Sequence, residues 1–269
     1  MTSVITKTDI YMGGVSLAQL DRRIIVQSIT ENAAETDHHV TKLAGHIGSR
    51  YTSTDRASLS VEVAFSIAGH HDLAGRAEVL QKVAAWALSS DTLTVSYRVG
   101  QMLEVVCTEL PALGDVKRWT EDLRMVFTAY AVPYWVDIEP YERQSTASKY
   151  TTTFNGIPNN SPLKPTIDLY ADVTTEGKIM TAFRVESGSQ VMRFTDLSIV
   201  AGDKIYVNHE RGLIKAYVEH ADGTVESILG KRTADSSDDI YLAIGNNIVT
   251  INATGLGAVW KLSFRGRYL

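Results

Sequence analysis

The histidines are the first side chains in this sequence whose type could do chemistry, because imidazole binds metals and transfers protons. Four of them form two adjacent pairs, His38–His39 and His70–His71. Adjacent side chains diverge, whereas two histidines that bind one metal from a helix are spaced i, i+4. No further ligand converges on either pair in the sequence. We therefore expect exposed loop histidines and no metal site.

Catalytic motifs are the next feature, and the sequence contains no G-x-S-x-G, no H-E-x-x-H and no Walker loop. Its acidic residues are scattered and form no recognisable glycosidase pair. The single cysteine, Cys107, has no partner for an internal disulfide, and its neighbours in MLEVVCTEL indicate a buried strand position. Active sites are often assembled from distant positions, so an enzyme stays one alternative. We expect a non-enzymatic protein without a cofactor.

The segment VNHER, residues 207–211, contains side chains of the kinds that bind sugars. Asn208, His209 and Arg211 provide hydrogen-bonding groups, and Trp260 could provide a ring for stacking. The alternative is a polar hairpin end and a core tryptophan within AVWKLSF. The spacing does not match the galectin sugar motif, and a fold analogy alone is weak support for a function.

The elements that would position these side chains differ between the two halves of the chain. Residues 58–67, SLSVEVAFSI, alternate between apolar and polar, which predicts a strand with one buried face. Residues 72–88 have apolar side chains at helical spacing, with Asp72 as the N-cap. Further strands are predicted at 22–29, 92–98, 102–108 and 118–130.

The second half has a different pattern. Residues 141–165 are rich in Ser, Thr, Asn and Pro, which is typical of a connection between domains. From residue 166 on, about nine short β runs alternate with turn signals, and no helix is evident, which favours a β-sandwich. We therefore predict a domain at 1–145 that is mainly β with one helix, and a β-sandwich domain at 146–269.

Composition and charge exclude several classes of protein. The chain has 269 residues and a net charge of −5; residues 1–145 contain 13 basic and 18 acidic side chains, and residues 146–269 contain 13 of each. No concentrated basic face is evident, so we expect no nucleic-acid recognition. No apolar run is long enough for membrane insertion. The N-terminal sequence lacks the features of a signal peptide, so we expect synthesis in a reducing cytoplasm.

The order of several segments resembles the distal tail protein (Dit) family of long, flexible-tailed bacteriophages. RRIIVQSITE is followed by a long excursion, by DRASLSVEVAFSI and by a helix leading into LQKVAAWALSSDTLTVSYRVGQMLEVVC. RMVFTAYAVPYW then ends a strand with a P-Y-W element, and IYLAIGNNIVTINA and VWKLSFRGRYL complete the second half. The resemblance covers nearly the whole chain, although no single motif is specific alone.

The resemblance implies a structural role at the tail tip of a virion. It implies an N-terminal β-sandwich or split-barrel domain that closes a homohexameric ring, followed by a galectin-like or carbohydrate-module-like β-sandwich at the periphery. The implied partners are the tail tube protein, the tail-associated hub or fibre protein, and a receptor-binding protein. DNA would pass through the lumen, and an acidic first half is consistent with a surface that does not retain it. The alternative function is a carbohydrate-binding module that recognises host glycans through the second domain.

A ring also implies a repeated contact between subunits, and the polar segment 31–57 is the candidate arm. A loop of this length is usually either functional or disordered. Its glycines at 45 and 48 would let it fold back as a hairpin. Its few apolar side chains are expected to contact the neighbouring subunit: Val40, Leu43, Ile47 and Tyr51.

The element PYW, residues 133–135, lies at the predicted border between the domains. Tyr134 and Trp135 bring large rings that favour burial, and Pro133 stiffens the chain where it leaves the strand. These residues are therefore expected to anchor the connection between the domains. A core cluster wholly inside the first domain is the alternative.

Overall fold

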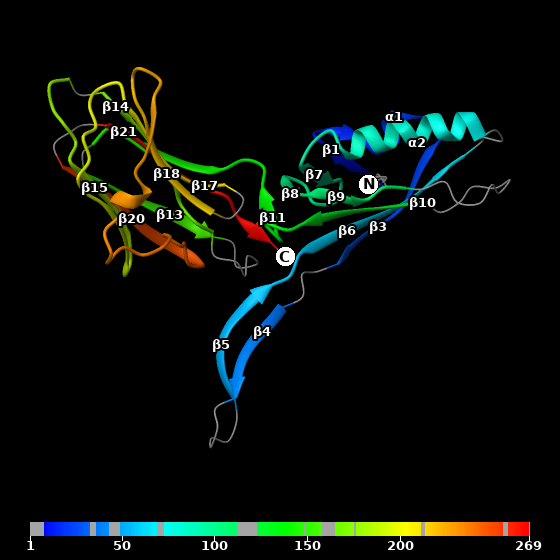
Figure 1. Ribbon diagram of the computed structural model, residues 1–269, viewed down its shortest axis with the longest axis horizontal. Helices are drawn as coiled ribbons and strands as arrows, with labels where there is room; N and C mark the ends of the chain where they lie inside the picture. The colour runs from blue at the N-terminus through cyan, green and yellow to red at the C-terminus, as the bar shows by residue number, and fades with distance from the viewer. Residues whose placement is uncertain are drawn as a thin grey trace, which may run out of the picture. The chain divides into compact units, whose positions relative to one another are not determined.

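The computed structural model describes ten segments of the chain: residues 8–32, 36–42, 49–68, 73–111, 123–147, 149–157, 165–174, 176–210, 213–254 and 258–268. The chain divides into two compact units, Met1–Val136 and Asp137–Leu269 (Figure 1).

In the described residues, the first unit contains two larger sheets and one two-stranded hairpin. The part of the first sheet that belongs to this unit has the strand order β2 (Val15–Ser16), β1 (Ile10–Met12), β7 (Thr92–Val95), β8 (Gln101–Glu104) and β11 (Trp135–Asp137). The other has the order β3 (Ile24–Asn32), β6 (Leu59–Ile67), β10 (Leu123–Ala129) and β9 (Val106–Glu109). Two helices accompany the sheets, the short α1 (Leu17–Leu20) and the longer α2 (Leu73–Ala87).

Strand β6 and helix α2 confirm the two strongest local predictions. The apolar side chains of β6 are buried at alternate positions, as one-sided burial of a strand requires. In α2 the buried positions include Val79, Val83 and Trp86, a stripe of helical spacing. The Trp86 ring meets Phe127 of β10 edge to face, with 6.0 Å between the ring centroids. This contact packs the helix against the sheet that contains β10.

The arm segment forms an antiparallel hairpin. Strands β4 (Thr36–Lys42) and β5 (Ser49–Arg56) pair with each other and, among the described residues, belong to no larger sheet (Figure 1). Val40 and Tyr51 are partners in the register, whereas Leu43 and Ile47 lie outside the described residues. His38 and His39 are strand residues of β4, so placing them in a loop was wrong; His70 and His71 also lie outside the described residues.

The second unit is built from two antiparallel sheets. The six-stranded sheet has the order β12 (Tyr141–Ser145), β21 (Ala258–Phe264), β14 (Asp168–Val173), β17 (Lys204–Glu210), β18 (Leu213–Glu219) and β19 (Val225–Ser227). The four-stranded sheet has the order β13 (Lys149–Ile157), β20 (Gly245–Thr254), β15 (Ala182–Ser187) and β16 (Gln190–Phe194). The 3-10 helix η1 (Leu229–Lys231) and the short strand β22 (Arg267–Tyr268) complete the unit.

One hydrophobic cluster contains the inward side chains of both sheets. Phe183 stacks on Phe194 within the four-stranded sheet, and it meets Trp260 of the six-stranded sheet at 5.8 Å between centroids. Two sheets that enclose one core form a β-sandwich. The predicted mainly β fold is therefore confirmed. Strand β12 belongs to this unit, because it pairs with β21 along its whole length.

Candidate functional site

The outer face of the six-stranded sheet has a row of three tyrosines, Tyr170, Tyr206 and Tyr217. They lie on β14, β17 and β18 and are direct partners in the register. Their neighbours along each strand are buried in the core, so alternation directs the tyrosines outward. The ring centroids are 5.1 Å apart between the first two rings and 4.8 Å apart between the last two. We call this set the tyrosine row.

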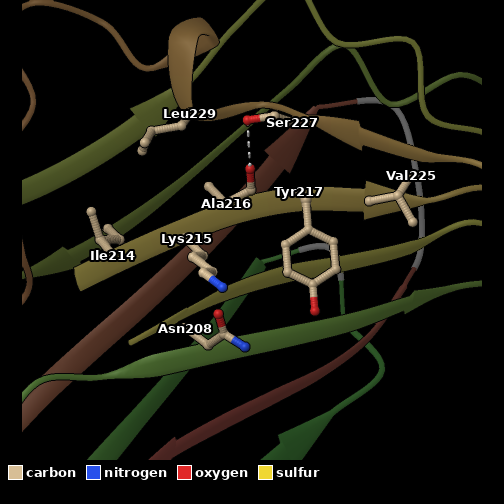
Figure 2. A pocket seen from close by; sticks show the side chains of 8 residues that line it. All are labelled: Asn208, Ile214, Lys215, Ala216, Tyr217, Val225, Ser227 and Leu229. Atoms are coloured by element: carbon tan, nitrogen blue, oxygen red, sulfur yellow. Dashed lines mark hydrogen bonds between the residues drawn. The ribbon is translucent and has the colours of Figure 1, made fainter. Parts of the chain in front are cut away.

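The tyrosine row ends beside a pocket at Tyr217. Tyr206 stacks on one face of this ring with an interplanar angle of 14°. The residue opposite Tyr217 on β19 is Ser227, whose short side chain does not continue the row. Tyr217 lines a pocket of about 470 Å³ (Figure 2), together with Asn208, Ile214, Lys215, Ala216, Val225, Ser227 and Leu229. We call it the Tyr217 pocket.

Polar groups of β17 and β18 border the Tyr217 pocket. Asn208 and Lys215 are partners in the register, one outward position along from Tyr206 and Tyr217. Figure 2 shows the Asn208 amide and the Lys215 ammonium beside the Tyr217 ring. The Asn208 Oδ1 atom is buried and accepts no hydrogen bond within the described part of the chain. A buried acceptor without a partner costs free energy, which a ligand donor would recover.

A carboxylate fixes the middle ring of the tyrosine row. Tyr206 Oη donates a hydrogen bond of 3.2 Å to Glu219 Oε2. Burial, followed by the hydrogen bond and charge of the Glu219 carboxylate, raises the pKa of Tyr206 to about 12. The phenol therefore stays protonated and keeps donating. This bond holds the ring on which Tyr217 stacks.

His209 is next to Asn208 in sequence but serves another purpose. Its Nδ1 lies 2.8 Å from Asp168 Oδ1 and its Nε2 lies 2.7 Å from Asp239 Oδ1. Burial lowers the pKa of His209, but the two carboxylates outweigh it and raise the pKa to about 9. The ring is therefore a charged imidazolium that donates through both nitrogens. It joins β17 to β14 and to the loop that contains Asp239.

The structure thus separates the residues that the sequence grouped as sugar contacts. Asn208 lines the Tyr217 pocket, whereas His209 does not and is occupied by two carboxylates. Arg211 lies outside the described residues. Trp260 is fully buried in the sandwich core, so its proposed use as a stacking ring was wrong. Alternation within AVWKLSF buries Trp260 together with the other inward residues of β21.

The tyrosine row itself was missed, although each strand contains a signal for it. DLYADV, KIYVN and KAYVE each place a tyrosine at an outward position between two buried residues. Only the register between the strands shows that the three rings touch.

Trp135 of the PYW element is buried in the first unit. Its Nε1 donates to Glu31 Oε2 at 3.0 Å, and the Arg98 guanidinium lies 4.9 Å from the centre of its ring. Arg98 also pairs with Glu31 at 2.6 Å. Burial raises the pKa of Glu31, but hydrogen bonds led by that from Arg98 lower it overall. Pro133 and Tyr134 are half-buried, and a role of the three residues in connecting the units stays a prediction.

Other candidate chemistry is sparse in the described segments. They contain no group of three or more His, Cys, Asp or Glu side chains arranged to hold a metal ion. Cys107 lies on β9, the edge strand of its sheet, and is half-exposed, so predicting a buried position was wrong. Burial still raises the pKa of its thiol, which disfavours the reactive thiolate. Among these described segments we find no helix with both the length and the apolar character needed to span a bilayer.

Comparisons with solved structures match the chain over nearly its full length. The Dit protein of phage SPP1 superimposes with a TM-score of 0.66 and 14% sequence identity, covering 97% of this chain and 99% of that one. This chain has the Dit fold. A protein of the phage p2 baseplate in its activated conformation superimposes with a TM-score of 0.50 and 10% identity, covering 95% and 97% of the two chains. No protein-family model and no curated protein sequence matches the chain.

Proposed function

We propose that this chain is a structural, non-enzymatic component of a phage tail tip that assembles as a homohexameric ring. The observation that carries the proposal is the correspondence of both units, over 97% of this chain and 99% of the other, with the SPP1 Dit protein. That protein is described as a paradigm of the hub adsorption apparatus in phages that infect Gram-positive bacteria. A match that includes both units favours a shared role over a shared module.

The β4–β5 hairpin supports the ring. Its two strands pair only with each other among the described residues, and an isolated hairpin is marginally stable in water. A contact with the next subunit would stabilise it. A head-to-tail contact of this kind relates each subunit to the next by a fixed rotation. The subunits close into a ring when a whole number of these rotations adds up to 360°.

The remaining partners follow from the position of such a ring. Its two ends would contact the tail tube protein and the tail-associated hub or fibre protein. The second unit would lie at the periphery and carry a receptor-binding protein. The acidic excess of residues 1–145 suits a lumen that lets DNA pass without binding it.

The mass of the purified protein tests the ring. One chain weighs 29.6 kDa, so light scattering should give about 180 kDa for a closed ring of six. Electron micrographs should show six-fold particles with a central hole, and antibodies should label the tail tips of the virions. A monomer at every concentration, together with unlabelled tail tips, would contradict the proposal.

A further inference from the structure

We propose that the Tyr217 pocket binds one pyranose ring of a glycan. The first argument is the aromatic surface. Tyr206 stacks on one face of the Tyr217 ring, Ser227 at the paired position of β19 adds no further ring, and Tyr217 lines the pocket. The face of an aromatic ring is electronegative and attracts polarised C–H groups. A pyranose presents such C–H groups on one face and hydroxyls around its edge.

The second argument is the polar border of the pocket. Asn208 Oδ1 is a buried acceptor without a donor in the described part of the chain, and a sugar hydroxyl would supply one. Lys215 lies across from it in the register, and its ammonium group carries three N–H donors. A purely apolar ligand would leave Asn208 unsatisfied. A ligand with alternating donors and acceptors fits better.

The third argument is rigidity. Tyr217 stacks on Tyr206, which is fixed in turn by Tyr170 and by the hydrogen bond to Glu219. A ring that is already ordered loses little conformational entropy when a ligand binds. The pocket volume of about 470 Å³ lies within the range usual for small-ligand sites. The proposal concerns this pocket alone and does not depend on ring assembly.

The test uses the full-length protein and a panel of monosaccharides and disaccharides at millimolar concentration, followed by saturation-transfer NMR and titration calorimetry. We expect at least one sugar to bind with its C–H protons against an aromatic ring. Tyr217→Ala should weaken that binding more than about tenfold, because one stacked aromatic contact is worth on the order of that factor. Tyr217→Phe keeps the ring face and should stay within about threefold of wild type, since the hydroxyl is not the stacking surface.

Two further variants separate binding from folding. Ser227→Tyr would place a fourth ring at the position paired with Tyr217 and would fill part of the pocket, so it should abolish sugar binding without lowering the melting temperature. Asn208→Ala removes the acceptor that has no partner, so it should weaken binding and leave the melting temperature nearly unchanged. Tyr130→Ala is the matched control, because Tyr130 is an exposed tyrosine of the first unit.

Two outcomes would overturn the proposal. One is that no sugar of the panel, and none on a glycan array, binds the wild-type protein. The other is that a sugar binds the Ser227→Tyr variant as tightly as it binds wild type, which would place the site elsewhere. Neither result bears on the proposed hexameric ring, because ring assembly is tested separately by measuring the mass of the particle.

Discussion

At the scale of single residues, His209 shows how a partly buried charge can stabilise this sandwich. Its imidazole is 10% exposed and lies between Asp168 and Asp239. Removing one member of such a group leaves the charges of the other members buried and uncompensated. The resulting loss of stability exceeds the net stabilisation that the intact group provides. The three residues come from separate parts of the chain, so their interaction ties the loop before β20 to the six-stranded sheet.

The raised pKa makes this contribution dependent on pH. The folded pKa of His209 is about 9 against 6.5 for an ordinary histidine. Its stabilisation is therefore fully present below about pH 6.5 and disappears as the pH rises through 9. We expect His209→Gln to lower the free energy of unfolding by on the order of 2 kcal/mol at pH 6, and by much less at pH 10. Thermal melts at both values measure the difference.

His220 provides a control for the His209 prediction. It also lies between two carboxylates, Asp203 and Glu226, but at the longer distances of 3.2 and 3.4 Å and with more exposure. Solvent screens such pairs, so His220→Gln should have the smaller effect. Equal losses for both variants, or a His209→Gln loss that persists at pH 10, would show that the charge is not the cause.

At the scale of elements, local periodicity was sufficient to predict a strand or a helix where that element buries one of its faces. The strand predicted at 58–67 is β6, Leu59–Ile67, and the helix predicted at 72–88 is α2, Leu73–Ala87. Periodicity could not predict that Cys107 is half-exposed, because that depends on β9 being an edge strand. Nor could it pair Glu31 with Trp135, which are 104 residues apart.

The tyrosine row illustrates the same limit at a candidate site. Alternation within each strand predicts that the three tyrosines face outward, but contact between them requires a particular strand order and register. Register is set by the pairing of whole strands around the core. The sequence therefore pointed to Asn208 as a candidate binding residue. It could not predict that Tyr217 lines the same pocket, because that depends on the strand register.

The arm gives a prediction at this scale. The pairing of β3 with β6 extends to Asn32 and Ser60, which flank the β4–β5 hairpin in the sequence. Replacing residues 34–54 with about six Gly/Ser residues should therefore leave the strands paired, because a flexible loop of that length closes at modest entropic cost. Circular dichroism should keep its β signature, while size-exclusion chromatography should shift from hexamer to monomer. A full ring with wild-type stability would place the subunit contact on the strand and helix faces instead.

At the scale of the whole molecule, the second unit has what an independent domain needs. Its two sheets share one continuous hydrophobic cluster, and its two ends are tied together. Asp137 begins the unit, and its Oδ2 accepts a hydrogen bond of 2.9 Å from the backbone N–H of Gly266 near the C-terminus. Arg265 Nη1 donates to the Asp137 carbonyl at 2.8 Å. A core of its own and connected ends are what an independently folding domain requires.

We therefore expect a fragment of residues 137–269 to unfold in one cooperative transition and to stay monomeric. A shorter fragment, 146–269, begins at the boundary suggested by composition and lacks β12. Without β12 the edge of β21 is unpaired, and Phe264 loses the stacked ring of Tyr141, 4.8 Å away between centroids. The shorter fragment should melt roughly 5–10 °C lower, because an aromatic pair and several strand hydrogen bonds are lost. Differential scanning calorimetry of the two fragments measures this difference. An unfolded or hexameric 137–269 fragment would mean that the second unit depends on the first, and that ring contacts extend into the sandwich.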